Sequence, residues 1–167
     1  GGILSKMCEF KDEAHFNSWD YSEFVRGYAK FLVEKIKFMV NDESSSMKVA
    51  NLSDEMRIER VLSRMENLQR LLERVLAMRP RTVNKHKKLI VIALYPVVEK
   101  SFKVYDDICE CLSFLLDLYW GMDYWNVVKS LGTYVTVAKQ IDELVEFYAW
   151  CKDFGVLTRK EYPVVER

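Results

Sequence analysis

Hydrophobic residues recur every three or four positions through most of the chain, and this spacing predicts long amphipathic helices. The first long helix is expected over residues 20–40, where a capping box opens it. A polar stretch with three consecutive serines follows and predicts a mobile loop over 41–53. Ser53 or Asp54 then caps a second helix. Arg79-Pro80 ends this helix, because the residue before a proline is pushed out of the helical region.

The second helix carries a strict heptad of apolar residues at Ile58, Val61, Met65, Leu68, Leu72 and Val75. A heptad is typical of a coiled coil, but it also fits one helix of a bundle. Further leucines at Leu62, Leu71 and Leu76 widen the apolar stripe beyond a two-position seam. The pattern therefore favours the bundle. A helical scaffold that self-associates through this heptad is the alternative.

An uncharged run from Leu89 to Val98 lies in the middle of the chain. It is too short to span a bilayer, which needs about 20 apolar residues, and it predicts a helix buried on nearly every side. We expect this third helix over residues 83–119, with a kink at Pro96 because proline cannot donate to the carbonyl four residues earlier. Gly121 breaks the chain, and a fourth helix is expected over 123–154.

Composition limits the class of protein. The 167 residues suit a single all-α domain, with one further short helix near residues 4–10. The formal net charge is zero, which argues against a nucleic-acid-binding protein. The four cysteines fit neither a disulfide framework nor a zinc site, and neither histidine lies in a recognised catalytic pattern. We therefore expect a monomeric protein that is not an enzyme and holds no metal or cofactor.

Five positive charges lie within ten residues where the second helix is followed by the third. They are Arg79, Arg81, Lys85, Lys87 and Lys88. Such a basic turn can contact anionic lipid headgroups, with about 1 kcal/mol for each basic residue near the surface. It can equally be a solvated turn between two helices. A lipid-binding module that uses this turn is therefore a second alternative for the function.

Aromatic residues gather around the break at Gly121, where Tyr119, Trp120, Tyr124 and Trp125 lie within seven residues. If some of them are exposed, they mark a surface for a partner. The other interpretation is that they seal the turn between the last two long helices.

Four segments carry a resemblance to a known family, in the same order along the chain. They are 21–35, which contains Phe-Val-Arg-Gly-Tyr-Ala-Lys-Phe-Leu, then 68–80, 90–96 and the Glu-Tyr-Pro-Val of 161–164. Together they resemble the ANTH domain of plant clathrin-assembly proteins, which are phosphatidylinositol-binding endocytic adaptors. The resemblance implies a right-handed superhelical stack of antiparallel α-helices, of which residues 1–167 form the C-terminal part. It also implies that phosphoinositide and clathrin are bound through parts of the full protein outside this chain.

The resemblance further implies binding of a vesicle SNARE of the VAMP type. In animal relatives the SNARE helix packs on an apolar surface of the last long helices. The resemblance places Leu116 and Ile141 of this chain at the two main apolar contacts of that surface. The neighbours expected on the same faces are Leu112, Tyr119, Val137 and Tyr148. Ordinary interhelical core is the alternative for all six. The function implied is an endocytic clathrin adaptor that retrieves SNARE cargo at the cytoplasmic face of the plasma membrane, in clathrin-coated pits and vesicles, with the Golgi as a further location.

Overall fold

The computed structural model describes residues 3, 6–7, 18–46, 53–79, 87–156, 158 and 161–163, and within the first long helix it describes the side chains of 22–41. The described elements are α2 (Ser18–Ser46), α3 (Asp54–Leu76), α4 (Lys87–Leu118), the short 3-10 helix η1 (Tyr119–Gly121) and α5 (Tyr124–Phe154). No strand occurs in these ranges. The predicted all-α class is therefore confirmed.

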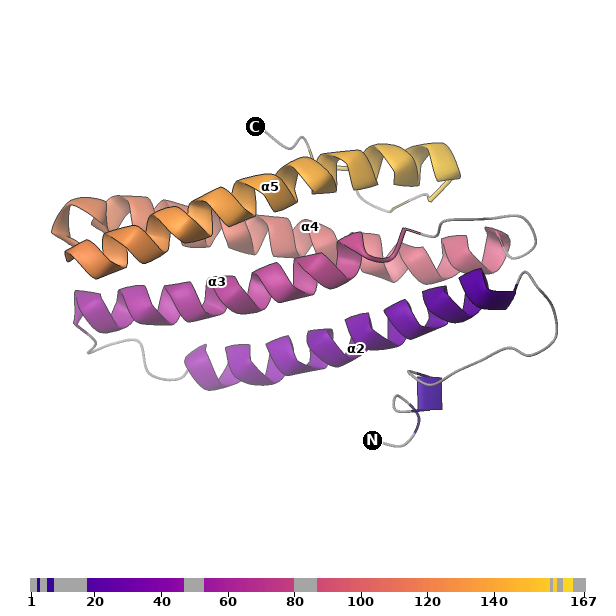
Figure 1. Cartoon of the computed structure of the whole chain (residues 1–167), viewed down its shortest axis with the longest axis horizontal. Helices are drawn as coiled ribbons and strands as arrows, with labels where there is room; N and C mark the ends of the chain where they lie inside the picture. Colours follow the sequence, from indigo (N-terminus) through magenta and orange to yellow (C-terminus); the bar gives the residue numbers. More distant parts are fainter. Residues whose placement is uncertain are drawn as a thin grey trace.

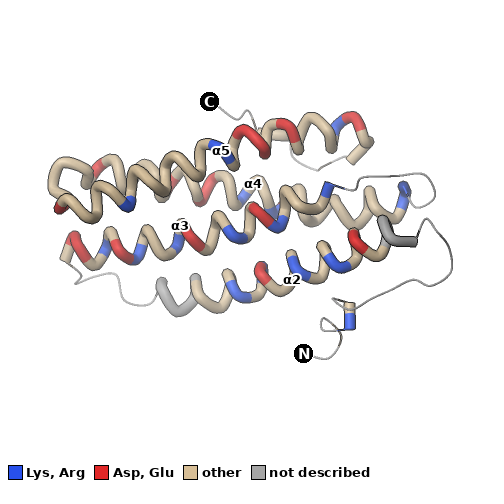
Figure 2. The backbone as a smooth tube through the Cα atoms, in the orientation of Figure 1, with Lys and Arg blue, Asp and Glu red and all other residues tan. Residues whose placement is uncertain are grey.

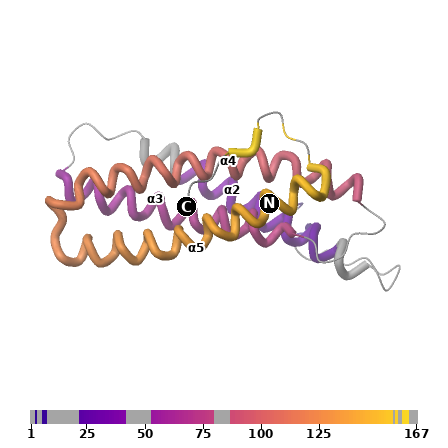
Figure 3. Tube along the Cα trace, turned by 90° about the horizontal axis from the view of Figure 1, so that it is seen from above, coloured from indigo at the N-terminus to yellow at the C-terminus, as the bar shows by residue number. Residues whose placement is uncertain are grey.

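The four long helices lie side by side, and each runs in the opposite direction to the one before it (Figure 1). α3 is central, because it packs against α2, α4 and α5. Figure 3 gives the view from above, in which η1 joins α4 and α5 at one end of the molecule. The expected stack of antiparallel helices is present in the described residues.

The heptad residues of α3 pack against other helices of the same chain. Five of its six positions are buried, and Val61 is partly buried against the same residues. The bundle interpretation is therefore confirmed, and the alternative of self-association through this heptad is wrong. The physical reason is that α3 has neighbours on three sides, so its wide apolar stripe meets other helices of the same chain.

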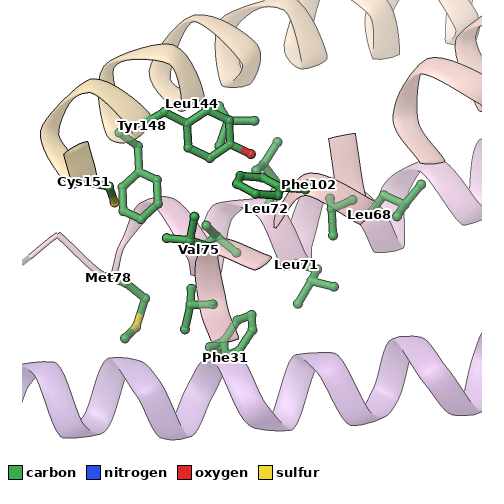
Figure 4. Packing of buried hydrophobic residues seen from close by; sticks show 14 of the residues in the cluster. Phe31, Leu68, Leu71, Leu72, Val75, Met78, Phe102, Leu144, Tyr148 and Cys151 are labelled. Atoms are coloured by element: carbon green, nitrogen blue, oxygen red, sulfur yellow. The ribbon is translucent and has the colours of Figure 1, made fainter. Parts of the chain in front are cut away.

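The core takes side chains from every long helix (Figure 4). Phe31 comes from α2, Leu68 and Leu72 from α3, Phe102 from α4 and Leu144 from α5. These residues belong to one continuous cluster of buried side chains. The cluster ties the four helices together and leaves other apolar residues outside it.

The boundaries of the first two long helices differ from the prediction. α2 begins at Ser18 and continues to Ser46, so the loop expected over 41–53 does not begin at residue 41. Serine and acidic residues are only moderate helix formers but do not stop a helix, which explains the longer span. Residues 47–52 lie outside the described part. α3 begins where expected, since the Ser53 hydroxyl accepts a hydrogen bond from the Met56 amide at 3.4 Å. It ends at Leu76, before the predicted Arg79-Pro80.

α4 is a single helix that passes through Pro96. Pro96 and Ile92 are both exposed, so water can reach the Ile92 carbonyl that the proline leaves without a donor. The kink expected at Pro96 stays a prediction. The expectation that the run 89–98 is buried on nearly every side is wrong, because Leu89 and Ile92 face solvent. Residues 80–86 lie outside the described part, as do most of 4–10, of which Lys6 and Met7 are described and helical.

The ends of α5 are as predicted. The Asp123 carboxylate accepts a hydrogen bond from the Asn126 amide at 2.7 Å and caps the first turn. Gly155 closes the helix with a φ of 89°, a left-handed conformation that glycine adopts without steric cost. The chain then folds back, and the Tyr162 ring lies 5.5 Å from Phe102 and 5.3 Å from Tyr148, centroid to centroid.

Candidate functional site

The first half of α5 is apolar on its exposed side. Between Tyr124 and Ala138 the only charged residue is Lys129, and Figure 2 shows this stretch as almost uniformly tan. The buried positions include the polar residues Asn126 and Ser130. The large exposed apolar residues are Tyr124, Trp125, Val128, Leu131, Tyr134 and Val135. The usual polarity of a surface helix is reversed here, and an exposed apolar patch of this kind marks an interaction surface.

α4 and α5 touch at a defined point in the second half of α5. The rings of Phe102 and Tyr148 meet edge to face with 5.5 Å between their centroids. The Tyr148 hydroxyl and the Ser101 hydroxyl are hydrogen-bonded at 2.9 Å. This contact shows which side of each helix faces the other.

Two apolar stripes run from this contact towards η1. Steps of three and four residues keep to one side of a helix. The α4 stripe, which continues from Phe102, consists of Tyr105, Cys109, Leu112, Leu116 and Tyr119. The α5 stripe, which continues back from Tyr148, consists of Val145, Ile141, Ala138, Tyr134, Leu131 and Val127. We call the surface formed by these two stripes the α4–α5 face.

The α4–α5 face has its most exposed large side chains in the half that lies towards η1, although the last residue of each stripe, Tyr119 and Val127, is partly buried. In the middle of the face, Ile141 and Leu112 are partly buried and pack against the core. Closer to η1, Leu116 is 68% exposed. Trp120 follows in the turn and is 93% exposed, with its ring edge-on to Tyr119 at 5.6 Å. The face therefore presents its largest free apolar area next to the turn.

The structure separates the six residues predicted to bind a SNARE. Leu112, Leu116, Tyr119 and Ile141 lie on the two stripes of the α4–α5 face. Val137 and Tyr148, in contrast, are core residues, with exposed fractions of 0% and 3%. The expectation that these two lie on an accessible surface is wrong, because that side of α5 is packed against the rest of the bundle. The ordinary-core alternative is correct for them.

The structure shows which of the aromatic residues around the turn are exposed. Trp120, Tyr124 and Trp125 are exposed, while Tyr119 is partly buried. The structure therefore favours a partner surface over a sealed turn. Sequence reasoning did not include Leu131, Tyr134 or Ala138 in the site. The regular spacing of α5 residues from Val127 to Val145 is the pattern that could have identified them.

The basic turn lies at the other end of α4 and α5, and three of its five residues are described. The Arg79 guanidinium is 5.7 Å from the centre of the Trp150 ring, and the Lys87 ammonium is 5.1 Å from that of Phe154. Exposed cation–π contacts of this kind contribute about 0.5–1 kcal/mol. Lys88 is also exposed. Arg81 and Lys85 lie outside the described residues, and the lipid contact expected of this turn stays a prediction.

Other chemistry in the described ranges is limited. No group of three His, Cys, Asp or Glu side chains there could hold a metal ion. None of the described helices combines the length and the hydropathy required to cross a bilayer. Burial raises the pKa of the Tyr148 and Tyr162 hydroxyls well above the usual value, so both stay protonated at the alkaline pH at which an exposed tyrosine ionises.

Comparison with known proteins places the chain in a family. The model of the ANTH domain matches residues 3–167. A probable clathrin assembly protein of Arabidopsis thaliana is 35% identical over the whole chain, which covers 36% of that protein. A putative clathrin assembly protein of the same plant is 33% identical over the whole chain, which covers 32% of that protein. The clathrin coat assembly protein AP180, also from this plant, is 26% identical, again over the whole chain and 30% of its length. The chain thus spans about a third of the length of these relatives, and it belongs to the ANTH domain family.

Proposed function

We propose that this chain is part of an endocytic clathrin adaptor and that its α4–α5 face binds one amphipathic helix of a VAMP-type vesicle SNARE. Membership of the ANTH family and the names of the relatives support the adaptor role. The single observation that carries the binding proposal is the pair of apolar stripes, whose large side chains Leu116, Leu131 and Tyr134 are exposed. The role is one of recognition without catalysis, at clathrin-coated pits and vesicles on the cytoplasmic face of the membrane.

The spacing of the stripes supports a helical partner. Residues three and four apart on α4 and α5 match the spacing at which a third helix presents its own apolar residues. The α5 stripe covers residues 127–145, a length of about 27 Å at 1.5 Å per residue. A partner helix of about five turns would therefore cover the face from Val145 to the turn at η1.

The edge of the face predicts the charge of the partner. Asp106, Glu110 and Asp117 each follow a residue of the α4 stripe directly, and all three are exposed. Carboxylates at this edge favour a partner helix with lysine or arginine along the side that lies next to α4. Such pairs at the rim change the association rate and its salt dependence more than the final affinity.

The experiment measures the affinity of a panel of VAMP-type SNARE helices for three variants. Leu116→Ser removes an exposed anchor, and Ile141→Lys places a charge in the contact. Ile92→Ser is the matched control, since Ile92 lies on the same helix as Leu116 and has nearly the same exposure, 69% against 68%, but is outside both stripes. We expect at least tenfold weaker binding for the first two variants, roughly 1.4 kcal/mol, and wild-type binding for Ile92→Ser.

Helicity and melting temperature are measured on the same samples. The melting temperature of Leu116→Ser should equal that of the wild type, because the side chain already faces water. Wild-type affinity in Leu116→Ser, or an equal loss of affinity in Ile92→Ser, would overturn the proposed surface. Ile141 is partly buried, so a large fall in the melting temperature of Ile141→Lys would assign that residue to the core and leave Leu116 as the deciding position.

A further inference from the structure

The outer side of α5 carries exposed apolar residues that belong to neither stripe of the α4–α5 face. Tyr124, Trp125, Val128 and Val135 are all exposed, and Gly132 lies among them. We call these five residues the outer seam. Steps of three and four residues connect them, which is the spacing of a contact between helices.

The outer seam points away from the rest of the bundle. At about 100° per residue, it lies about 110° around α5 from the stripe of the α4–α5 face and about 150° from the buried positions. α5 lies at the edge of the bundle (Figure 1), and its neighbours α3 and α4 contact other sides of it. A helix bound to the α4–α5 face therefore leaves the outer seam free.

Packing within the described chain gives no reason for a glycine in the middle of this seam. Apart from its own stretch of helix, no atom of the described residues lies within 4 Å of the place that a β-carbon would take at Gly132. Glycine inside a helix lowers its stability relative to alanine. It does, however, allow another backbone to approach closely. Gly132 therefore points to a close contact from outside the chain.

Charged residues are absent from the outer seam and follow directly after it. They are Lys139, Asp142, Glu143 and Glu146, and all four are exposed. A parallel pair of α5 helices would place like charges side by side, whereas an antiparallel pair carries them past the end of the apolar stretch. The formal net charge of the chain is zero, so two copies do not repel each other at long range.

These features fit a partner with the same pattern of sizes and charges. We propose that the outer seam binds the outer seam of a second copy of this chain, in an antiparallel pair of α5 helices. The apolar stretch 124–138 then lies on itself, with the two-fold axis close to Gly132, where the backbones approach most closely. Trp125 of each copy packs beside Val135 of the other. The monomer expected from the sequence is then one member of a concentration-dependent equilibrium.

The contact is small, so the dimer should be transient. A tyrosine or tryptophan side chain buries about 150–250 Å² in a well-packed contact. Two such side chains and two valines from each copy bury on the order of 1,000 Å² in total, which is the lower limit for a specific interface. The dimer leaves the α4–α5 face of both copies free, because that face lies on a different side of α5.

Sedimentation equilibrium tests the proposal over about 1–100 μM protein, which covers the micromolar end of interface affinities. The mean mass should rise with concentration from 19.8 kDa towards twice that value. Val135→Glu should weaken the association at least tenfold. Ile92→Glu makes the same change at an exposed apolar residue of α4, and Leu116→Ser alters the α4–α5 face. Both controls should associate like the wild type.

Gly132→Leu separates the dimer from the stability of the fold. The leucine side chain prevents the close approach at the axis, so association should weaken at least tenfold. Leucine is also a better helix former than glycine. The melting temperature of Gly132→Leu, measured at the lowest protein concentration, should therefore be no lower than that of the wild type.

A mixing experiment tests the antiparallel arrangement. Trp125→Lys and Val135→Glu should each fail to associate alone. In an equimolar mixture the lysine of one copy meets the glutamate of the other, while the second Trp125–Val135 contact stays as in the wild type. The mixture should associate at least tenfold more tightly than either variant. In a parallel pair the two new charges lie about 15 Å apart along the helices, and no recovery is expected.

Several results would overturn the proposal. They are a mass of 19.8 kDa at every concentration, wild-type association of Gly132→Leu, and no recovery in the mixture. A loss in Ile92→Glu or Leu116→Ser equal to that in Val135→Glu would show that association does not depend on the outer seam. Cosedimentation of a monomer with phosphatidylcholine vesicles, lost in Val135→Glu, would assign the outer seam to a lipid surface instead.

Discussion

The hydrogen bond between Ser101 and Tyr148 gives the most detailed prediction. The Ser101 hydroxyl donates to the Val98 carbonyl at 2.7 Å, so its only proton is in use. The Tyr148 hydroxyl, 2.9 Å away, must therefore donate to the Ser101 oxygen. Both side chains are buried, so neither hydroxyl can turn to water instead.

The two single substitutions have different consequences. Tyr148→Phe removes the donor and leaves the Ser101 proton with its carbonyl acceptor, so it should cost only about 0.5–1.5 kcal/mol. Ser101→Ala leaves the tyrosine hydroxyl buried without an acceptor, which costs about 1–3 kcal/mol. Alanine is a better helix former than serine, and this offsets up to about 0.5 kcal/mol of the loss in stability.

A double-mutant cycle separates these contributions. Urea and thermal unfolding, followed by circular dichroism, give the free energy of unfolding for the wild type, both single variants and the double variant. Ser101→Ala should destabilise the wild type but be neutral or stabilising in the Tyr148→Phe background, where no donor is left without a partner. For a domain of this size, 1 kcal/mol corresponds to a shift of about 2–4 °C in melting temperature.

Additive effects in this cycle would refute the reasoning. They would show that the Tyr148 hydroxyl does not depend on Ser101. Wild-type stability of Ser101→Ala would contradict the assigned direction of the hydrogen bond, because the tyrosine hydroxyl would then have another acceptor.

Three further predictions concern the end of α5 and the cysteines. Gly155→Ala should lower the free energy of unfolding by about 1 kcal/mol in urea titrations, because φ is 89° at this position, and no loss would contradict the left-handed cap. Iodoacetamide and peptide mapping should label the exposed Cys109 in the native protein and spare the buried Cys111 and Cys151 until urea is added, whereas equal native labelling would disprove this burial. Burial raises the pKa of Cys151 from 9.0 to about 12, so native stability should be full below pH 9 and fall as the pH rises above it, where only the unfolded chain ionises. The urea midpoint should fall less steeply between pH 8, 9 and 10 for Cys151→Ala than for the wild type. An identical fall in both proteins would rule out a contribution of Cys151 to the pH dependence of stability.

Local sequence was sufficient for several parts of the fold. Ser53 and Asp123 cap their helices as expected, and Gly155 closes α5, because each depends only on a side chain or a backbone angle within a few residues. The heptad of α3 also indicated a helix with several neighbours, because its stripe was wider than a two-helix seam needs. The length of α2 was underestimated, since serine and acidic residues weaken a helix without ending it.

The candidate site was predicted only in part. Ile141 and Val137 lie one helical turn apart on α5, and both are apolar. The sequence therefore offered no means of deciding which of them is more exposed. In the folded chain Val137 is fully buried, whereas Ile141 lies at the edge of the α4–α5 face. The difference comes from the side of α5 that packs against the bundle, which depends on residues far away in the chain.

The amino-acid sequence by itself determined the helical class, the order of the four long helices and the chemistry of most helix ends, because periodicity and capping act over a few residues. Only the tertiary structure decided which apolar side chains remain outside the core. α5 carries apolar residues on more than one side, and the packing of α3 and α4 against it leaves Leu131 and Tyr134 in water. The outer seam likewise stays free only because α3 and α4 pack against other sides of α5, and these contacts join residues that are distant along the chain.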